Sequence, residues 1–399
     1  MGAHPHDADA AGKVELAQVF ARHGAAYLAT HRLAPVQYRA LRAIEACRTA
    51  ALGGHVARCD ACGRLRYSYY SCRNRHCPKC QTLAKERWLA ARRTELLPVP
   101  YFHVVFTLPH ELSPLAQGNP RVIYRLLFAA ASRTLLEFGE NPRWLGGEIG
   151  VTMVLHTWGQ TLSQHLHVHA LVSGGALGAE GGWIHPRRGF LFPVKALSQV
   201  FRGKFLCGLQ RAFDSGALAL AGSTAALTDV RRRVALFAAL RAQSWVVYAK
   251  RPVAGPEQIL QYLGRYTHRI ALTNNRLLSL SDTAVRFRYQ DYAAGNRRKV
   301  MALEPAEFIR RYLAHVLPRG FMRIRHYGLN GNRTKRHQLA QARAALDCPS
   351  PEPVRIAPES IEAFWLRIAQ LDIHQCPQCR SGTLRRIGTL APRAHGPPP

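Results

Sequence analysis

Residues 165–172 read HLHVHALV, with a histidine at every second position before an apolar tail. Successive side chains of a strand point to opposite faces, so His165, His167 and His169 are expected on one face. A single histidine on a strand is usually a hydrogen-bonded core residue. Neighbouring same-face imidazoles, about 6–7 Å apart at their Cα atoms, are costly to bury without an ion between them. The pattern therefore predicts that His167 and His169 bind a metal ion.

A complete metal site needs a third ligand, and the sequence offers two candidates. His165 lies on the same predicted strand, whereas His156 lies eleven residues before His167 in a separate predicted strand. We favour His156, because pairing of the two strands can bring it across, while three ligands from one strand must stretch to converge. Nitrogen ligands suit Zn²⁺ or Mn²⁺ better than Mg²⁺, so the ligands alone do not settle the metal.

Cysteines form a second candidate site. CDACG at 59–63 and CPKC at 77–80 make two C-x2-C pairs with fourteen residues between them. Each pair can place two thiolates around one zinc ion, and two pairs complete a closed, structural tetrahedron. Cys72 and His76 lie inside this segment, and either could replace a ligand or belong to a second site. The expected zinc ligands are Cys59, Cys62, Cys77 and Cys80.

The remaining cysteines are less clearly assigned. Cys376 and Cys379 form another C-x2-C pair with no partner pair nearby in the sequence. Cys348 and His374 are the nearest candidates to complete a site with them. In a protein expected in the cytoplasm, cysteines are more often metal ligands or inert core thiols than disulfides.

Basic residues and tyrosines are interleaved in the cysteine-rich segment. Arg73, Arg75 and Lys79 follow Tyr67 and Tyr69. Arginine and lysine bind phosphates or base edges, and tyrosine can stack on unpaired bases, so this pattern fits a DNA-contacting surface. The tyrosines fit the core of a small zinc module equally well.

Tyr262 and Tyr266 are four residues apart in a predicted helix, which places both phenols on one side. They belong to an apolar stripe at helical spacing, and such stripes are usually core. A predicted metal-binding strand in a very basic chain favours a second interpretation, in which the two tyrosines are nucleophiles. A phenol has a pKa near 10 and attacks weakly, but a cation bound to the attacked phosphate compensates. Arg265 and Arg269 would give the same helix a DNA-binding edge.

The composition favours a nucleic-acid partner. The chain has 399 residues, 55 Lys and Arg against 24 Asp and Glu, and a net charge of +31. The positive electrostatic field of such a charge attracts polyanions, of which nucleic acid is the usual one. The absence of an apolar run near 18 residues, or of an apolar signal segment, predicts a cytoplasmic protein without a membrane partner. No G-x4-G-K-[ST] loop is present, so no nucleotide cofactor is expected.

These residues must be positioned by a mixed architecture, expected to be α+β with a mostly antiparallel sheet. Helices are predicted at 13–50 (interrupted near Pro35), 83–97, 120–138, most of 195–250, 255–271 and 304–316. Strands are predicted at 101–109, 149–158, 165–175, 285–292 and 299–303, the last two as a hairpin. The six-residue gap between the strands of His156 and His167 suits an antiparallel pair.

Together these motifs resemble the HUH endonuclease superfamily, and within it the two-tyrosine rolling-circle insertion-sequence transposases with an N-terminal zinc-binding domain. The resemblance runs from about residue 35 to 330. It rests on the His-hydrophobe-His strand, the Y-x3-Y helix and the run SCRNRHCPKCQ, together with CRTAALGGHV, YFHVVFTLP, HTWGQTL and GFMRIRHYGLNGNRTKR. It implies a palm-like antiparallel sheet with the histidine strand at its centre and the tyrosine helix beside it.

We divide the chain accordingly into three parts. Residues 1–100 would be a helical and zinc-binding DNA-recognition domain, 101–316 the HUH catalytic domain, and 317–399 a basic C-terminal extension with the CPQC knuckle and a disordered tail. The sequence does not fix the oligomeric state.

The resemblance implies a transposase that nicks and rejoins single-stranded DNA at insertion-sequence ends through 5′-phosphotyrosine intermediates. Tyr262 and Tyr266 would be the nucleophiles, and a Mg²⁺ or Mn²⁺ ion on His167, His169 and His156 would bind the scissile phosphate. A plasmid replication initiator or relaxase of the same superfamily is the nearest alternative. A zinc-dependent DNA-binding regulator without catalysis would leave the histidines without a role.

Overall fold

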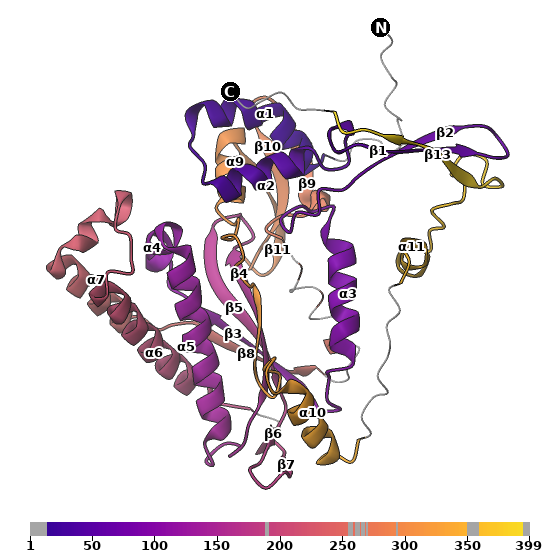
Figure 1. The fold of residues 1–399 in the computed structure, drawn as a ribbon. Helices are drawn as coiled ribbons and strands as arrows, with labels where there is room; N and C mark the ends of the chain where they lie inside the picture. Colours follow the sequence, from indigo (N-terminus) through magenta and orange to yellow (C-terminus); the bar gives the residue numbers. More distant parts are fainter. Residues whose placement is uncertain are drawn as a thin grey trace.

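A five-stranded antiparallel sheet forms the centre of the protein (Figure 1). The computed structural model describes residues 14–187, 191–253, 258–259, 264, 268, 270–292, 294–348 and 359–393, except the side chains at 250–253. The strands of the sheet are β3 (Tyr101–Thr107), β4 (Gly150–Trp158), β5 (Gln164–Ser173), β8 (Val247–Val253) and β12 (Ile324–Gly328). Their spatial order is β12-β4-β5-β3-β8, so β5 lies in the middle. The abundance of valine and aromatic residues in these segments favours extended structure.

One face of this sheet is apolar and packs against helices. The covering helices are α4 (Ser113–Gly118), α5 (Pro120–Glu140) and α6 (Val194–Asp214) (Figure 1). Strand β3 contributes Phe102, Val104 and Phe106 to this core. Side chains alternate along a strand, so His103 must point to the opposite face. The largest core therefore lies on the face of the sheet opposite to His103.

The opposite face is covered by α3 (Gln81–Arg93) and α10 (Lys335–Ala344). A smaller apolar cluster joins Tyr101 and Leu171 of the sheet to Leu339 of α10. Arg92 of α3 also lies against this face, because its Nη1 is 3.2 Å from Nε2 of His326 on β12. Figure 1 shows α3 and α5 on opposite sides of the sheet.

A second core joins both halves of the chain. It contains α1 (Leu16–Thr30), α2 (Pro35–Glu45), α9 (Pro305–Leu313) and the sheet β11-β10-β9, and buries Phe20, Phe287 and Phe308. The bounds of these strands are Leu277–Leu280 (β9), Val285–Asp291 (β10) and Arg297–Leu303 (β11). Pro35 begins α2, where its missing N–H costs no helical hydrogen bond, and this explains the break between the first two helices.

A three-stranded sheet projects from the body of the protein (Figure 1). It has the order β13-β1-β2, where β1 is Gly54–Cys59, β2 is Leu65–Tyr69 and β13 is Leu384–Leu390. Both pairings are antiparallel, so a strand near the C-terminal end completes a hairpin near the N-terminal end.

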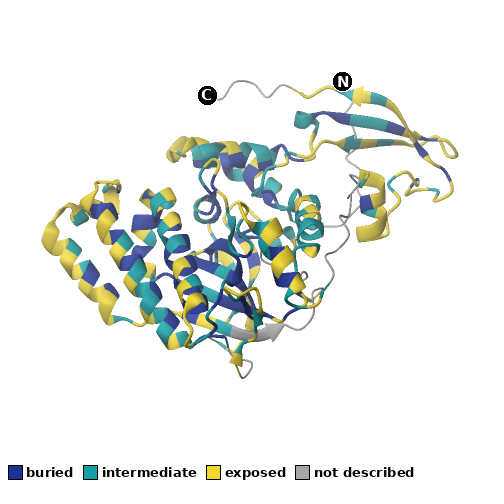
Figure 2. Cartoon of the chain, turned by 60° about the horizontal axis from the view of Figure 1, so that its bottom comes forward, coloured by how far each residue is buried: buried dark blue, intermediate teal, exposed yellow. Residues whose placement is uncertain are grey.

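Shorter or more exposed elements complete the described structure. Helix α7 (Val230–Ala242) is mostly exposed (Figure 2). None of the helices in the described ranges has the length and apolar character needed to cross a bilayer. The shorter or more exposed elements, besides α7, are the 3-10 helices η1 (Ala50–Leu52), η2 (His110–Leu112), η4 (Gly222–Thr228) and η5 (Asn274–Arg276), helix α11 (Ile361–Ala369), and strands β6 (Ala176–Leu177) and β7 (Trp183–Ile184).

The expected α+β class with antiparallel sheets is confirmed, including the 285–303 hairpin. Most of the expected helix at 255–271 lies outside the described residues. The sheets do not follow the three expected parts of the chain. Strand β12, in the expected C-terminal extension, is an edge of the central sheet, and β13 pairs with β1 of the N-terminal part. Strand pairing, rather than chain order, therefore sets the structural units at the C-terminal end.

Candidate metal centres

Three histidines converge on the polar face of the central sheet. His156 on β4 lies directly opposite His167 on β5, and His169 is two residues further along β5. One ring nitrogen from each of the three lies within 4.8 Å of the others. His156 and His167 are buried, and His169 is half-buried. The antiparallel register thus brings together the three imidazoles that we expected from the sequence.

Hydrogen bonds orient these rings. Nδ1 of His167 lies 2.9 Å from the carbonyl oxygen of His165, which can only accept, so this nitrogen carries the proton and donates. Nε2 of His167 is then the unprotonated nitrogen, the form that binds metals. Nε2 of His169 and Nδ1 of His156 are 3.0 Å apart, close enough to ligate one ion. His165 itself is exposed and lies outside the group.

A fourth histidine supports this group from the neighbouring strand. Nε2 of His103 on β3 lies 2.8 Å from Nδ1 of His169, and the two ring planes are nearly parallel with centroids 5.1 Å apart. His103 is 4% exposed. Sequence reasoning missed this residue, although the alternation of YFHVVFT already placed His103 on the face opposite to Phe102 and Val104. A partner on Nδ1 holds the His169 ring so that Nε2 faces the cluster.

The donor set fits a divalent cation. Three neutral imidazoles that share a small, partly buried volume are the ligands of many Zn²⁺, Mn²⁺ and Fe²⁺ sites. A protonated cluster would place like charges within a few ångströms of each other, which is costly. His156 also stacks on Trp158, with ring centroids 4.6 Å apart, and this indole restricts the ring further. Three protein ligands would leave at least one coordination position of such an ion for a further ligand.

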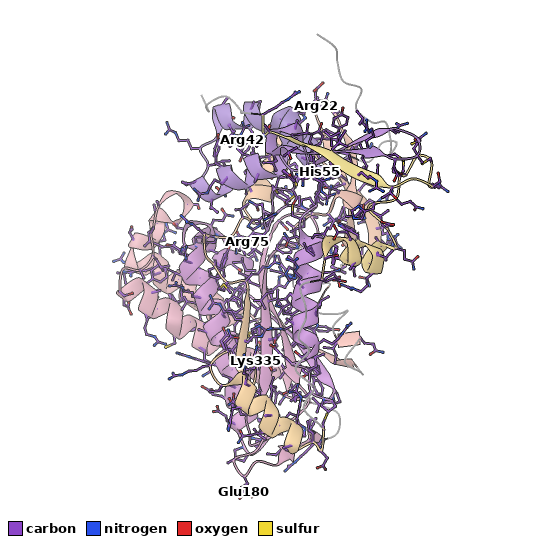
Figure 3. The ribbon with its side chains drawn as sticks, turned by 45° about the vertical axis from the view of Figure 1, so that its right-hand side comes forward. Arg22, Arg42, His55, Arg75, Glu180 and Lys335 are labelled. Carbon is purple, nitrogen blue, oxygen red and sulfur yellow. The ribbon has the colours of Figure 1, made fainter. Side chains whose placement is uncertain are left out.

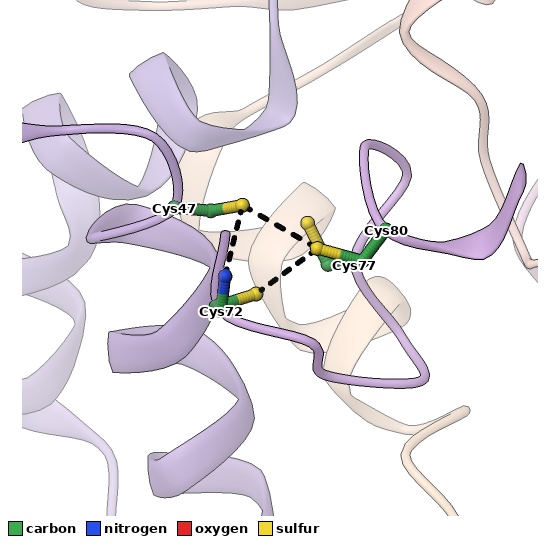
Figure 4. Close-up of side chains that lie close together, drawn as sticks. All are labelled: Cys47, Cys72, Cys77 and Cys80. Carbon is green, nitrogen blue, oxygen red and sulfur yellow. Dashed lines mark hydrogen bonds between the residues drawn. The ribbon is translucent and has the colours of Figure 1, made fainter. Parts of the chain in front are cut away.

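Four cysteines form a second cluster at the base of the β1–β2 hairpin (Figure 4). Cys47 follows α2, Cys72 follows β2, and Cys77 and Cys80 precede α3. The sulfur of Cys80 lies 3.6 Å from the sulfurs of both Cys47 and Cys72. Hydrogen bonding with Cys47 lowers the pKa of the Cys80 thiol and raises the pKa of Cys77, because crowded thiols compete for the same protons. Four sulfurs in this arrangement match a tetrahedral zinc site.

Cys59 and Cys62 belong to a different cluster, which corrects the expected zinc site. The structure does not bring them to Cys77 and Cys80; it places them beside Cys376 and Cys379. The physical reason is the hairpin, since Cys59 lies at its tip and Cys72 follows its base. Five paired residues separate tip from base, and strands rise about 3.3 Å per residue, so the two knuckles cannot share one ion.

The alternatives inside the cysteine-rich segment are also resolved by position. Cys72 belongs to the first cysteine cluster, whereas His76 is outside it. The ring of His76 accepts a hydrogen bond from the backbone N–H of Leu317 at 3.4 Å, and burial lowers its pKa to about 3. His76 is therefore a buried neutral residue at the contact between the N-terminal part and the loop after α9.

The basic residues predicted to bind DNA differ in their surroundings. Arg75, labelled in Figure 3, donates hydrogen bonds to the carbonyls of Leu317, Pro318 and Phe321 at 2.7–3.2 Å. Its guanidinium therefore binds a loop of the protein. Lys79 forms an ion pair with Glu15. Arg73 is exposed. Of these three basic residues, Arg73 is thus the most accessible to a phosphate.

The two tyrosines and the arginines of the expected catalytic helix lie outside the described residues: Tyr262, Tyr266, Arg265 and Arg269. Three described residues of the same segment lie on the side of the sheet that α3 covers, one against the sheet and two against α3. Ile259 is fully buried in the cluster with Tyr101 and Leu171. His268 lies against Trp88 of α3 with ring centroids 5.9 Å apart, and a Cβ on Gly264 would lie 2.9 Å from Leu89.

Comparison with known proteins gives a consistent picture. Residues 150–338 match the protein family described as "Putative transposase", and residues 19–108 match "Transposase zinc-binding domain". The chain is 49% identical over 376 residues to "Putative transposase y4qJ" of Sinorhizobium fredii, covering 94% of each chain. It is 28% identical over 327 residues to "Transposase for insertion sequence element IS801" of Pseudomonas savastanoi pv. phaseolicola, covering 80% of this chain and 77% of that protein. No solved structure matches the chain.

Proposed function

The chain belongs to the IS91/IS801-type transposase family with an N-terminal zinc-binding domain, and from this membership we propose that it nicks and rejoins single-stranded DNA at the ends of an insertion sequence. The histidine cluster on the central sheet carries the proposal, because a DNA-binding protein without catalysis has no need of three converging imidazoles. In this proposal the central sheet is the palm of an HUH endonuclease.

His156, His167 and His169 are the proposed ligands of a catalytic Mg²⁺ or Mn²⁺ ion. When bound, the ion would neutralise charge on the scissile phosphate. The chain itself orients the ligands: the carbonyl of His165 sets the tautomer of His167, and His103 holds His169. Such hydrogen bonds to the ligands raise metal affinity, because the rings need not reorganise on binding.

Tyr262 and Tyr266 are the proposed nucleophiles. In the cleavage step the phenol oxygen of one tyrosine forms a bond to phosphorus while the bond from phosphorus to the 3′ oxygen breaks. The phenol loses its proton, and the leaving 3′ oxygen gains one to become a hydroxyl. The 5′-phosphotyrosine keeps a phosphodiester bond, so rejoining to another 3′-hydroxyl reverses the step without a nucleotide cofactor. A second tyrosine permits a second transfer before the first is resolved.

The described neighbours of these tyrosines support the assignment. Ile259, Gly264 and His268 contact the side of the molecule formed by α3 and the polar face of the central sheet. The three histidines belong to the same face. These three described residues therefore lie on the side of the sheet where a phosphate bound at the histidines would lie, which supports the proposed role of the tyrosines.

The projecting sheet is the proposed DNA-recognition surface. Leu65, Tyr67 and Tyr69 alternate along β2 on one face, and the paired residue Arg58 of β1 lies on the same face. Tyr67 is 46% exposed and Tyr69 is 38% exposed, which favours the DNA-contacting interpretation of these tyrosines over the core interpretation. Exposed aromatic rings beside arginines provide stacking for unpaired bases and charge for phosphates. In the same proposal the cluster of Cys47, Cys72, Cys77 and Cys80 binds the structural Zn²⁺ that fixes the base of this sheet.

The proposal is tested by incubating the purified protein with Mn²⁺ and a labelled single-stranded end sequence. We expect a covalent protein–DNA adduct that disappears on protease digestion and does not form in the presence of a chelator. The double variant Tyr262→Phe, Tyr266→Phe should form no adduct and keep its DNA affinity. Tyr292→Phe, at an exposed tyrosine of the β10–β11 turn, is the matched control and should react normally.

Two outcomes would overturn the proposal in different ways. Normal adduct formation by the double variant would show that another residue is the nucleophile. Tight DNA binding by the wild-type protein without any cleavage, at all metal concentrations, would indicate a zinc-dependent regulator instead.

A further inference from the structure

Two C-x2-C pairs from opposite ends of the chain meet at the tip of the projecting sheet. Cys59 ends β1, Cys62 lies in the turn between β1 and β2, and Cys376 and Cys379 precede β13. The sulfurs of Cys59 and Cys379 are 3.6 Å apart, and those of Cys62 and Cys376 are 3.8 Å apart, although more than 300 residues separate the partners in sequence. All four sulfurs lie within 4.8 Å of one another.

The backbone around both pairs is arranged to stabilise thiolates. The N–H of Cys62 donates to the sulfur of Cys59 at 3.5 Å, and the N–H of Gly382 donates to the sulfur of Cys379 at 3.3 Å. Both donors lie three residues after the cysteine that accepts. A metal ligand must be the thiolate rather than the thiol, so N–H donors directed at sulfur are expected at a metal site.

Specific contacts hold the two pairs together. The N–H of Asp60 donates to the carbonyl of Thr383 at 3.1 Å, and the N–H of Thr383 donates to the carboxylate of Asp60 at 2.7 Å. Arg385 forms an ion pair with the same carboxylate. A Cβ on Gly382 would lie 2.4 Å from the sulfur of Cys59, so the close approach of the two loops requires glycine there.

The apolar core of this unit is too small to account for such an arrangement. It consists of Ala57, Cys59, Cys376 and Leu384 with the partly buried Cys379. Modules with so little buried apolar area need a metal ion or disulfides to remain folded. Disulfides require sulfurs about 2.05 Å apart, whereas the two sulfur–sulfur distances of 3.6 and 3.8 Å between the pairs match edges of a zinc tetrahedron.

We propose that Cys59, Cys62, Cys376 and Cys379 bind a second structural Zn²⁺, which joins the C-terminal segment 359–393 to the N-terminal zinc-binding part. Two of these four ligands, Cys376 and Cys379, lie outside residues 19–108, the range that matches the zinc-binding domain. The ion closes a ribbon of β1, β2 and β13 and makes the C-terminal strand a component of the N-terminal unit. The inference does not depend on nuclease activity.

The test measures zinc per chain in the purified full-length protein under reducing conditions. The double variant Cys376→Ser, Cys379→Ser should contain one equivalent of zinc less than the wild type. Cys59→Ser, Cys62→Ser should lose the same one equivalent, and the quadruple variant should lose no more than either double variant. Cys207→Ser, Cys348→Ser is the matched control, since neither cysteine belongs to a metal-binding cluster within the described residues, and it should keep the full zinc content.

A rescue variant separates loss of the site from misfolding. Cys376→His retains a zinc ligand and should keep the equivalent that Cys376→Ser loses. Zinc losses that add up in the quadruple variant would show that the two pairs bind different ions. An unchanged zinc content in both double variants would overturn the proposal. Two disulfides among these four cysteines, found by mass spectrometry of wild-type protein alkylated without reduction, would also overturn it.

Discussion

The rings of His103 and His169 lie edge to edge across β3 and β5, with Nε2 of His103 2.8 Å from Nδ1 of His169 and their planes 13° apart. The contact leaves Nε2 of His169 directed at His156, 3.0 Å away. A histidine that touches no substrate thereby fixes the orientation of a proposed metal ligand.

Substitution of His103 should weaken metal binding more than it lowers the rate of DNA cleavage at saturating metal. In His103→Ala, the Mn²⁺ concentration for half-maximal DNA nicking should rise about 10–100-fold. The rate at saturating Mn²⁺ should stay close to that of the wild type, because the three ligands remain. His103→Gln, which keeps a polar partner for Nδ1 of His169, should recover part of the affinity. A metal titration of adduct formation measures both variants, and an unchanged titration curve for His103→Ala would contradict the positioning role.

The third metal ligand can be identified by comparing two histidines. His156→Ala should abolish metal-dependent cleavage, because His156 is one of the three clustered rings. His165→Ala should cleave almost normally, because its exposed side chain lies outside the cluster of ring nitrogens and the variant keeps the backbone carbonyl that contacts His167. Isothermal titration with Mn²⁺ provides a second readout. The opposite ranking of the two variants would assign the ligand to His165.

Two neighbouring arginines should have different roles. Arg75→Ala leaves half-buried carbonyls without donors and should lower the free energy of unfolding by about 2–3 kcal/mol. Arg73→Ala should change stability by less than about 0.5 kcal/mol and reduce the salt dependence of DNA binding by about one counterion. Denaturant titrations and DNA affinities at several salt concentrations separate the effects. Equal losses of stability would rule out this distinction.

Cys47 should be required for zinc binding, although the spacing pattern of the sequence does not include it. Cys47→Ser should remove one equivalent of zinc and lower the melting temperature, because the cluster adjoins the buried core of α1, α2 and α9. The exposed Cys207 is the control, and Cys207→Ser should retain both properties. Zinc analysis and calorimetry check this prediction, which fails if Cys47→Ser keeps its zinc.

Acid should destabilise the protein partly through His315. Burial lowers the pKa of His315 to about 4, from about 6.5 in an unfolded chain. Between these values the unfolded state binds a proton that the folded state does not, so stability falls as the pH decreases from 6.5 towards 4. The neutral ring is held by Thr157 at 3.2 Å and by the carbonyl of Leu162 at 3.0 Å.

The variant His315→Gln should lose less of its free energy of unfolding than the wild type as the pH falls from 6.5 to 4. The difference between the two losses should reach up to about 3 kcal/mol at pH 4. Denaturant titrations at pH 7, 6, 5 and 4 measure the difference. His76 and His326 also have a lowered pKa and remain in both proteins, so the comparison isolates His315. Parallel stability curves for the two proteins would show that His315 does not titrate in this range.

Local patterns in the sequence were sufficient for much of the site. The two-residue period of a strand placed His167 and His169 on one face, and the spacing to the preceding strand favoured His156 as their neighbour. Pro35, the hairpin at 285–303 and the helix that begins at Pro120 follow equally from local rules. These features depend on backbone geometry within a few residues, and the amino-acid sequence specifies that geometry directly.

The partners of each cysteine pair, and the support of His169 by His103, were decided only by the tertiary structure. Both depend on which strands pair: β13 with β1 brings Cys376 and Cys379 to Cys59 and Cys62, and β3 with β5 brings His103 to His169. Every C-x2-C knuckle has the same local shape and can combine with any other. The choice between partners is made by sheet register and buried area across hundreds of residues, which the spacing of cysteines in the sequence does not encode.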